Sequence, residues 1–214
     1  MKDRFKQEER TVFLWGILGT NGTGKSVTAR EVAKLWKQSR PHDDIMAFDP
    51  TDSFRGVANK FIYPHEDWYD KALGLRNALL ILDEVRILHS SNIADRRLLE
   101  LLSMRREYSI DIIYIVHNPK LVLEILTYYT TRYFIFYTQS RYGSFKDKMP
   151  NYAICHGAST FINKYVTRNG RGDYPNFPYM VVDNEKESIN GINIDTNKID
   201  DAIDFNDMYN PLTL

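Results

Sequence analysis

The sequence predicts an α/β fold in which a mostly parallel β-sheet is flanked by helices and followed by a small C-terminal extension. Two observations support this fold class. Short apolar runs alternate with helical segments from residue 11 to residue 137, and such alternation favours parallel strands joined by crossover helices. The apolar run at residues 78–82 is continuous, which is typical of a strand covered on both faces.

The first half of the chain opens with a strand and a helix. Residues 11–18 form an apolar run that predicts a buried strand, and the segment that follows places Val27, Val32, Leu35 and Trp36 on one helical face. The expected elements are strands at residues 11–18, 45–48 and 78–82, a helix at 27–38, and an irregular segment at 51–74 with one short helix near 65–73.

The second half continues the alternation as far as residue 140. Several leucines predict the buried side of one helix, and Pro119 is suited to the first turn of another. The expected elements are a helix at residues 95–107, a strand at 110–116, a short helix from Pro119, a strand at 132–137, and short added strands at 151–156 and 179–182 around a turn at 168–173. We therefore divide the chain into a core (1–140), a continuation of the core (141–182) and an acidic, loosely structured tail (183–214).

The composition argues against several classes of protein. The net charge is zero, so the overall balance favours neither nucleic acid nor a membrane surface. Cys155 is the only cysteine, which rules out a disulfide framework and indicates a reducing compartment. No apolar stretch approaches the roughly 20 residues of a membrane span, and the charged first residues do not resemble a secretory signal. We expect an intracellular, soluble protein.

The segment from residue 19 to residue 26 matches the phosphate-binding pattern G-x-x-x-x-G-K-[ST] without a mismatch. Its glycines allow a tight loop whose backbone N–H groups face phosphate oxygens. Lys25 would reach the β- and γ-phosphates, and the Ser26 hydroxyl would bind Mg²⁺. The expected nucleotide-binding residues are Gly19, Thr20, Asn21, Gly22, Thr23, Gly24, Lys25, Ser26 and Val27. The sequence therefore predicts a nucleoside triphosphate site.

The strand at residues 78–82 is followed by two carboxylates, Asp83 and Glu84. Ligands collect at the carboxyl ends of strands in α/β sheets. Asp83 would hold Mg²⁺ as a Walker B acid does, and Glu84 would orient and deprotonate an attacking water. The alternative is a strand end with two solvated acids. A small-molecule kinase would need an acceptor pocket and a lid, and no Arg-rich lid segment is evident.

The strand at residues 110–116 ends in His117-Asn118-Pro119. A polar side chain at this tip can contact the γ-phosphate and the attacking water, so His117 or Asn118 is a sensor candidate. The alternative is a hydrogen-bonded turn histidine.

Arg105 and Arg106 end the preceding helix, where an arginine can complete a neighbouring subunit's site as a finger. They could instead stabilise the helix C-terminus. Arg96, Arg97 and Arg141 are rival finger candidates.

Together these residues resemble the FtsK–HerA superfamily of P-loop ATPases, especially the genome-packaging ATPases of membrane-containing icosahedral viruses. Asp49-Pro50 is similar to the Asp-Pro segment of HerA-like proteins, and residues 101–110 look like that group's Arg-bearing stretch before the sensor strand. The resemblance spans residues 12–137. The family often has Thr-Gln at the sensor strand, and His117 stands here in the place of that glutamine.

The resemblance implies a RecA-like P-loop NTPase core and a Mg²⁺-dependent ATPase that translocates DNA, most simply into a viral capsid. It also implies a homo-oligomeric ring, pentameric or hexameric, with ATP bound between subunits and with capsid or vertex proteins as partners. Such a protein would act in the cytoplasm of an infected cell or at a virion vertex. The alternatives are a morphogenesis ATPase of filamentous phages (the zonula occludens toxin-like group, which usually has a membrane span), a nucleotide-dependent switch or adaptor that hydrolyses ATP poorly, and a small-molecule kinase.

A basic stretch at residues 132–171 is the candidate DNA-binding segment. It contains seven Lys/Arg against one acid, Asp147, with interleaved aromatic residues. Cations neutralise phosphates, and exposed rings stack on bases. The expected DNA-binding residues are Arg141, Lys146, Lys148, Arg168 and Arg171. The alternative is that the aromatic residues belong to the core and the cations form a solvated rim.

Overall fold

The computed structural model describes residues 11–63, 68–84, 92–118, 122–139 and 149–199. The described elements, in chain order, are β1 (Leu14–Leu18), α1 (Lys25–Ser39), β2 (Asp44–Phe48), β3 (Lys60–Ile62), α2 (Trp68–Leu73), β4 (Ala78–Leu82), α3 (Asn92–Met104), β5 (Ile110–Val116), α4 (Glu124–Tyr129), β6 (Arg132–Ile135), α5 (Tyr152–Asn169), β7 (Tyr179–Asp183), β8 (Ser188–Ile192) and a short 3-10 helix (Thr196–Lys198).

The strands form one eight-stranded sheet in the order β3-β2-β4-β5-β1-β6-β7-β8. The strands from β3 to β6 pair in parallel, whereas β7 and β8 pair antiparallel to their neighbours at the far edge. This confirms the predicted fold class, a mostly parallel sheet flanked by helices. The order also places β5 between β1 and β4. The loops that follow these three strands, which contain the predicted site residues, therefore begin side by side.

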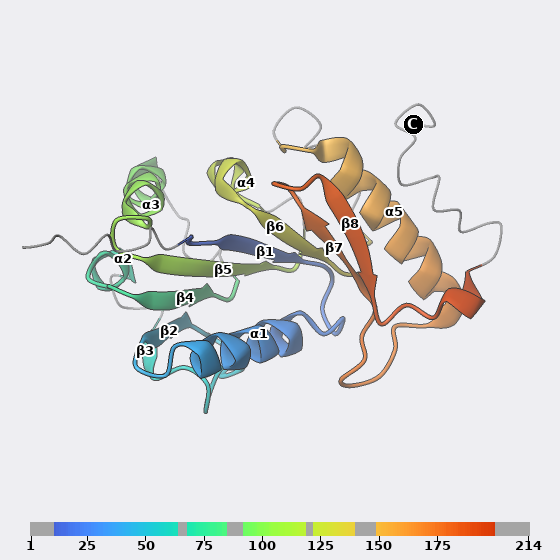
Figure 1. The fold of residues 1–214 in the computed structure, drawn as a ribbon, viewed down its shortest axis with the longest axis horizontal. Helices are drawn as coiled ribbons and strands as arrows, with labels where there is room; N and C mark the ends of the chain where they lie inside the picture. The colour runs from blue at the N-terminus through green and yellow to red at the C-terminus, as the bar shows by residue number, and fades with distance from the viewer. Residues whose placement is uncertain (1–10, 64–67, 85–91, 119–121, 140–148, 200–214) are drawn as a thin grey trace, which may run out of the picture.

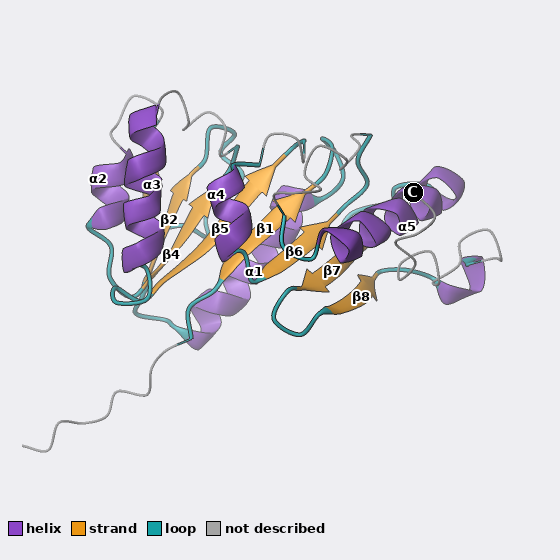
Figure 2. Ribbon diagram, turned by 90° about the horizontal axis from the view of Figure 1, so that it is seen from above, coloured by secondary structure: helices purple, strands orange, loops and turns teal. Residues whose placement is uncertain are grey.

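Helices cover both faces of the sheet (Figures 1 and 2). Helix α1 packs on one face through Ala29, Ala33 and Trp36, whose spacing of three to four residues places them on one side of a helix. Helices α2, α3, α4 and α5 lie on the other face, over a larger apolar cluster. Each side of the sheet therefore has its own core, and every residue of β4 and of β5 is buried.

One buried carboxylate, Asp111 on β5, ties three elements together at the amino end of the parallel strands. It accepts hydrogen bonds from the Phe13 N–H (2.9 Å) and from the Trp36 Nε1–H (2.7 Å), and Arg40 lies 3.7 Å away. Asp111 is 0% exposed. The bonds from the start of β1 and from α1 offset the cost of burying its charge.

Several segments differ from the sequence prediction, and one is residues 60–62, which were expected to be irregular and form the short strand β3. Residues 151–156, expected as a strand, form the first turns of α5, because apolar side chains recur every three to four residues through Val166 and pack on β6 and β7. The tail expected to be loose contains β8, which is held by backbone pairing to β7 although its own side chains are largely exposed. The predicted helix from Pro119 falls partly outside the described residues, and α4 begins at Glu124.

Candidate active site

The candidate site lies where β1, β4 and β5 end at the same edge of the sheet. The loop after β1 is fastened to two other strand ends: the Gly19 N–H donates to the Val116 carbonyl (3.2 Å), and the Thr20 N–H donates to the Tyr137 carbonyl (2.9 Å). Asp83 and Glu84 follow β4, and His117 follows β5. The strand order therefore brings together the three groups of residues that the sequence singled out.

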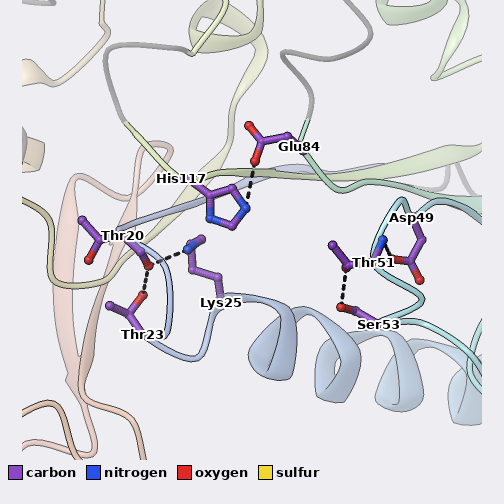
Figure 3. A network of polar contacts seen from close by, with 8 residues as sticks. All are labelled: Thr20, Thr23, Lys25, Asp49, Thr51, Ser53, Glu84 and His117. Carbon is purple, nitrogen blue, oxygen red and sulfur yellow. Dashed lines mark hydrogen bonds and ion pairs between the residues drawn. The ribbon is translucent and has the colours of Figure 1, made fainter. Parts of the chain in front are cut away.

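The loop of residues 19–26 is held in shape by its own hydrogen bonds (Figure 3). The carbonyl of Thr20 accepts from the Thr23 hydroxyl (2.8 Å) and from the Lys25 amino group (2.7 Å). Gly24 has a φ of +92°, a left-handed conformation that suits glycine. A Cβ built on Gly24 would also overlap the ring of Phe177, so this position is closed to larger residues for two separate reasons.

Lys25 is 3% exposed, and its burial dominates its electrostatics. Burial lowers the pKa of Lys25 from 10.5 to about 8, although the charges of Asp83 and Glu84 act in the opposite direction. The amino group is therefore still mostly protonated at neutral pH. A poorly hydrated cation is strongly attracted to phosphate, because little water must be displaced when the anion arrives.

Asp83 is the buried acid of the site, at 2% exposure. Its N–H donates to the Phe48 carbonyl (2.9 Å), which fixes the end of β4 against the end of β2. Burial raises the pKa of Asp83 to about 6, and the charges of Asp49 and Glu84 raise it further. Its Oδ1 is buried and has no hydrogen-bond partner among the described residues.

An unpartnered carboxylate oxygen is the kind of ligand that Mg²⁺ takes. The half-buried hydroxyl of Ser26, on the first turn of α1, supplies a second oxygen donor near the end of the loop. The residues present therefore fit a Mg²⁺ held by Asp83 and Ser26 together with the nucleotide and water. Among the described residues no cluster of three or more His, Cys, Asp and Glu side chains could hold a metal by itself.

Asp49 organises the turn after β2 and also acts on Asp83. Its carboxylate accepts hydrogen bonds from the Thr51 N–H and hydroxyl (both 3.2 Å) and from the Phe54 N–H (2.6 Å). Figure 3 shows this turn across the site from Lys25. The Asp-Pro segment thus has a structural role in the turn, and its negative charge increases the tendency of Asp83 to bind a cation or a proton.

Glu84 and His117 form an ion-pair contact of 2.8 Å between Oε2 and Nε2 (Figure 3). Burial, followed by the charge of Lys25, lowers the pKa of His117 below its usual value, while Glu84 opposes that change. A neutral ring donates from Nε2 to the carboxylate. The Nδ1 atom is buried and makes no hydrogen bond within the described part of the chain. Glu84 has a φ of +58°, which is unusual for a residue with a side chain.

The two finger candidates differ in exposure. Arg105 is 2% exposed, and its carbonyl accepts from the Ile110 N–H (2.8 Å) at the amino end of β5. Burial lowers the pKa of Arg105. A side chain enclosed in its own subunit cannot reach a neighbour, so the structure does not favour Arg105 as a finger, whereas Arg106 is exposed. Of the rivals, Arg97 pairs with Asp70 (2.5 Å), Arg96 is exposed, and Arg141 lies outside the described residues.

The predicted DNA-binding residues do not form one described surface. Arg141, Lys146 and Lys148 lie outside the described residues. Arg168 is exposed in the last turn of α5, and Arg171 lies instead beside the phosphate-binding loop. Two of the interleaved aromatic residues, Phe161 and Tyr165, are buried in the core at 1% and 5% exposure, so they are not available to stack on bases.

Sequence reasoning missed the contribution of residues 171–177 to this site. Arg171 and Asn21 are 150 positions apart, and no local motif connects them.

Within the described part of the chain, no helix is long and apolar enough to cross a membrane.

No protein-family model matches this chain, and no curated protein sequence matches it. Among solved structures, the chain is similar to B204, the DNA-packaging ATPase of Sulfolobus turreted icosahedral virus, with a TM-score of 0.54 and 14% identity over 84% of this chain and 96% of that one. The genome-packaging NTPase B204 of Sulfolobus turreted icosahedral virus 2 in complex with AMP gives a TM-score of 0.57 and 11% identity over 85% and 96%. ATPases 2 and 3 of EccC from Thermomonospora curvata give 0.57 and 12% over 85% of this chain and 36% of that one. The chain therefore has the P-loop NTPase fold of these structures, as the resemblance implied.

Proposed function

We propose that this protein is a Mg²⁺-dependent ATPase. The observation that supports this most strongly is the convergence of Lys25, Asp83 and the Glu84–His117 pair at one edge of the sheet. Lys25 would bind the β- and γ-phosphates, and Asp83 with Ser26 would hold Mg²⁺, which neutralises charge on the phosphate oxygens. Glu84 would take a proton from the attacking water, and His117 would fix the carboxylate in position through its Nε2 hydrogen bond. In this proposal His117 acts on Glu84, in addition to or in place of a direct γ-phosphate contact.

Two substitutions test this assignment by separating binding from hydrolysis. Lys25→Ala should weaken ATP binding about tenfold or more, because a hydrogen bond to a charged group is worth about 1.5–3 kcal/mol. Glu84→Gln should keep ATP binding and lower turnover by about 10²-fold or more, because an amide cannot accept the proton. Phosphate release and equilibrium binding, measured on the same preparations, provide the two readouts. Glu84→Gln turning over at the parental rate would remove Glu84 from the catalytic role.

We further propose that the ATPase translocates DNA, and that it does so as the motor that drives a viral genome into a capsid. The support for this is the fold shared with B204, the DNA-packaging ATPase of Sulfolobus turreted icosahedral virus. Under this proposal the protein works as a homo-oligomeric ring together with capsid or vertex proteins, in the cytoplasm of the infected cell or at a virion vertex. Antibody detection of the protein in purified particles would distinguish a virion component from a purely cytoplasmic motor.

The proposed DNA contacts are testable through salt dependence. Charge reversal at Lys146 and Lys148 should flatten the dependence of log affinity on log salt by about one unit for each lost phosphate contact. DNA-free ATP hydrolysis should stay at the parental rate, because neither residue is assigned to the nucleotide site. An unchanged slope would direct the search to the basic N-terminal residues or to the helix that contains Arg96 and Arg97.

A further inference from the structure

The segment between α5 and β7 lies against the phosphate-binding loop. The Arg171 Nη1 donates to the Asn21 carbonyl at 3.4 Å, and a Cβ built on Gly22 would lie 3.9 Å from the same nitrogen. The Arg171 guanidinium also lies over the Tyr137 ring, with its central carbon 5.2 Å from the ring centroid. Tyr137 in turn holds the start of the loop through its carbonyl. A hydrogen bond and a cation–π contact therefore locate one cation beside residues 20–22.

The topology explains why this segment arrives there. Strand β7 is antiparallel to β6, and its Met180 pairs with Ile135, the last residue of β6. The chain that precedes β7 must therefore cross the edge of the sheet where the phosphate-binding loop lies. Phe177 anchors this crossing, because its ring packs on Gly24 and its carbonyl accepts from the Asn193 side chain (3.0 Å).

The position of Arg171 relative to Lys25 indicates which part of a nucleotide it would meet. Lys25 donates to the Thr20 carbonyl (2.7 Å) and Arg171 donates to the next carbonyl, that of Asn21. Two cations thus flank the same limb of the loop, and Lys25 is the residue assigned to the β- and γ-phosphates. A guanidinium has five N–H donors in a planar fork, so a contact to one carbonyl leaves donors for phosphate oxygens. Arg171 is exposed and therefore accessible to a ligand.

We propose that Arg171 is a phosphate ligand of the nucleotide site in its own subunit, where it contacts the β- and γ-phosphates of ATP rather than DNA. This inference rests on the proposed ATPase function. Arg171 would add a second positive charge to that of Lys25. It would also let the site distinguish a triphosphate from a monophosphate, because only a triphosphate extends along residues 20–22 toward both cations.

The test is calorimetric titration with Mg-ATP and with AMP. The Glu84→Gln background prevents consumption of ATP. Arg171→Ala should weaken ATP binding about tenfold or more and leave AMP binding within about twofold, since AMP lacks the phosphates concerned. Arg171→Lys should recover part of the ATP affinity, because the charge remains while the planar fork is lost. Lys186→Ala is the matched control, and it should change neither affinity. Lys186 is an exposed cation in the turn after β7, at the amino ends of the parallel strands and away from the nucleotide site.

Equal weakening of ATP and AMP binding by Arg171→Ala, or no weakening of either, would overturn the proposal. A parental protein that binds ATP without hydrolysing it would refute the ATPase function, yet the comparison of ATP with AMP would still decide the role of Arg171. Mixing Arg171→Ala subunits with Glu84→Gln subunits adds a test of the same-subunit assignment. No gain over the summed activities is expected, because every site would lack one of the two residues; a gain would place Arg171 in a neighbour's site and contradict the assignment.

Discussion

Replacing Asp83 with asparagine should stabilise the nucleotide-free protein while it abolishes the ATPase activity. Asp83 is 2% exposed, and its pKa is raised from 3.8 to about 6, first by burial and then by the charges of Asp49 and Glu84. A shift of about two units at about 1.36 kcal/mol per unit corresponds to about 3 kcal/mol of destabilisation by the ionised carboxylate at pH 7.5. A neutral amide of nearly the same shape removes that cost.

The dependence on pH has a definite sign. Because the pKa of Asp83 is higher in the folded state than in the unfolded state, the cost is fully present above pH 6 and disappears below pH 3.8. The advantage of Asp83→Asn should therefore shrink to about 1 kcal/mol at pH 4.5, where the folded protein already binds the proton. Urea denaturation at pH 7.5 and at pH 4.5, without nucleotide or Mg²⁺, measures both values.

Asp111 provides the matched control, since it is also a buried aspartate on a neighbouring strand. Both of its oxygens accept hydrogen bonds, from Phe13 and from Trp36, and an asparagine would present an N–H to one of these donors. Asp111→Asn should therefore destabilise the protein by about 1.5–3 kcal/mol. If Asp83→Asn also lowers the free energy of unfolding at pH 7.5, the explanation by burial and charge repulsion is wrong.

Four further outcomes follow from the site. His117→Ala should lower kcat by about 10²-fold with nearly unchanged ATP binding, because Glu84 loses the contact that positions it; an unaltered kcat would exclude the pair from catalysis. Arg106→Ala subunits mixed with Glu84→Gln subunits should regain ATPase activity if Arg106 acts across a subunit boundary, whereas Arg105→Ala should lower the melting temperature and show no such complementation. Gly24→Ala should abolish nucleotide binding or folding, since the new Cβ meets a left-handed backbone and the Phe177 ring, and a variant with parental binding would show that the ring moves aside. The apparent affinity for Mg²⁺, read from ATPase rates at several pH values, should fall by up to about tenfold per unit below pH 6 as protons compete for Asp83; a profile without this fall would indicate that Asp83 is not the ligand.

The central strands were predictable because short, largely apolar runs rich in Ile and Leu between polar segments favour buried strands. Residues 78–82 are apolar throughout and residues 110–116 are apolar except for Asp111, which indicates cover on both faces, and β4 and β5 occupy those same residues. The loop after β1 was predictable because its glycine pattern is tied to a specific backbone conformation. Since parallel strands end at one edge, the sequence also predicted that Lys25, Asp83 and His117 would lie near one another.

The rest depended on contacts that local patterns do not contain. Residues 151–156 were expected as a short strand, although Cys155, Ile162 and Val166 follow the helical spacing of α5 when a longer window is taken. Strand β8 is a five-residue segment of mixed polarity that contains an asparagine and a glycine, and its backbone pairs with β7 along its length. The contact between Arg171 and Asn21 arises from the antiparallel direction of β7, which the sequence does not specify.

The hydrogen bonds of Asp111 have a mechanical consequence for a protein proposed to be a motor. Helix α1 begins in the phosphate-binding loop at Lys25, and near its other end Trp36 is bonded to Asp111 on the central strand β5. Its 15 residues span about 22 Å. The helix is therefore held at both ends, and we expect it not to change its orientation when phosphates bind at its first turn. Displacement driven by ATP would then have to leave the site on the other face of the sheet, starting from Glu84 and His117. Hydrogen exchange should remain equally slow along α1 with and without nucleotide, while any change appears on that other face of the sheet.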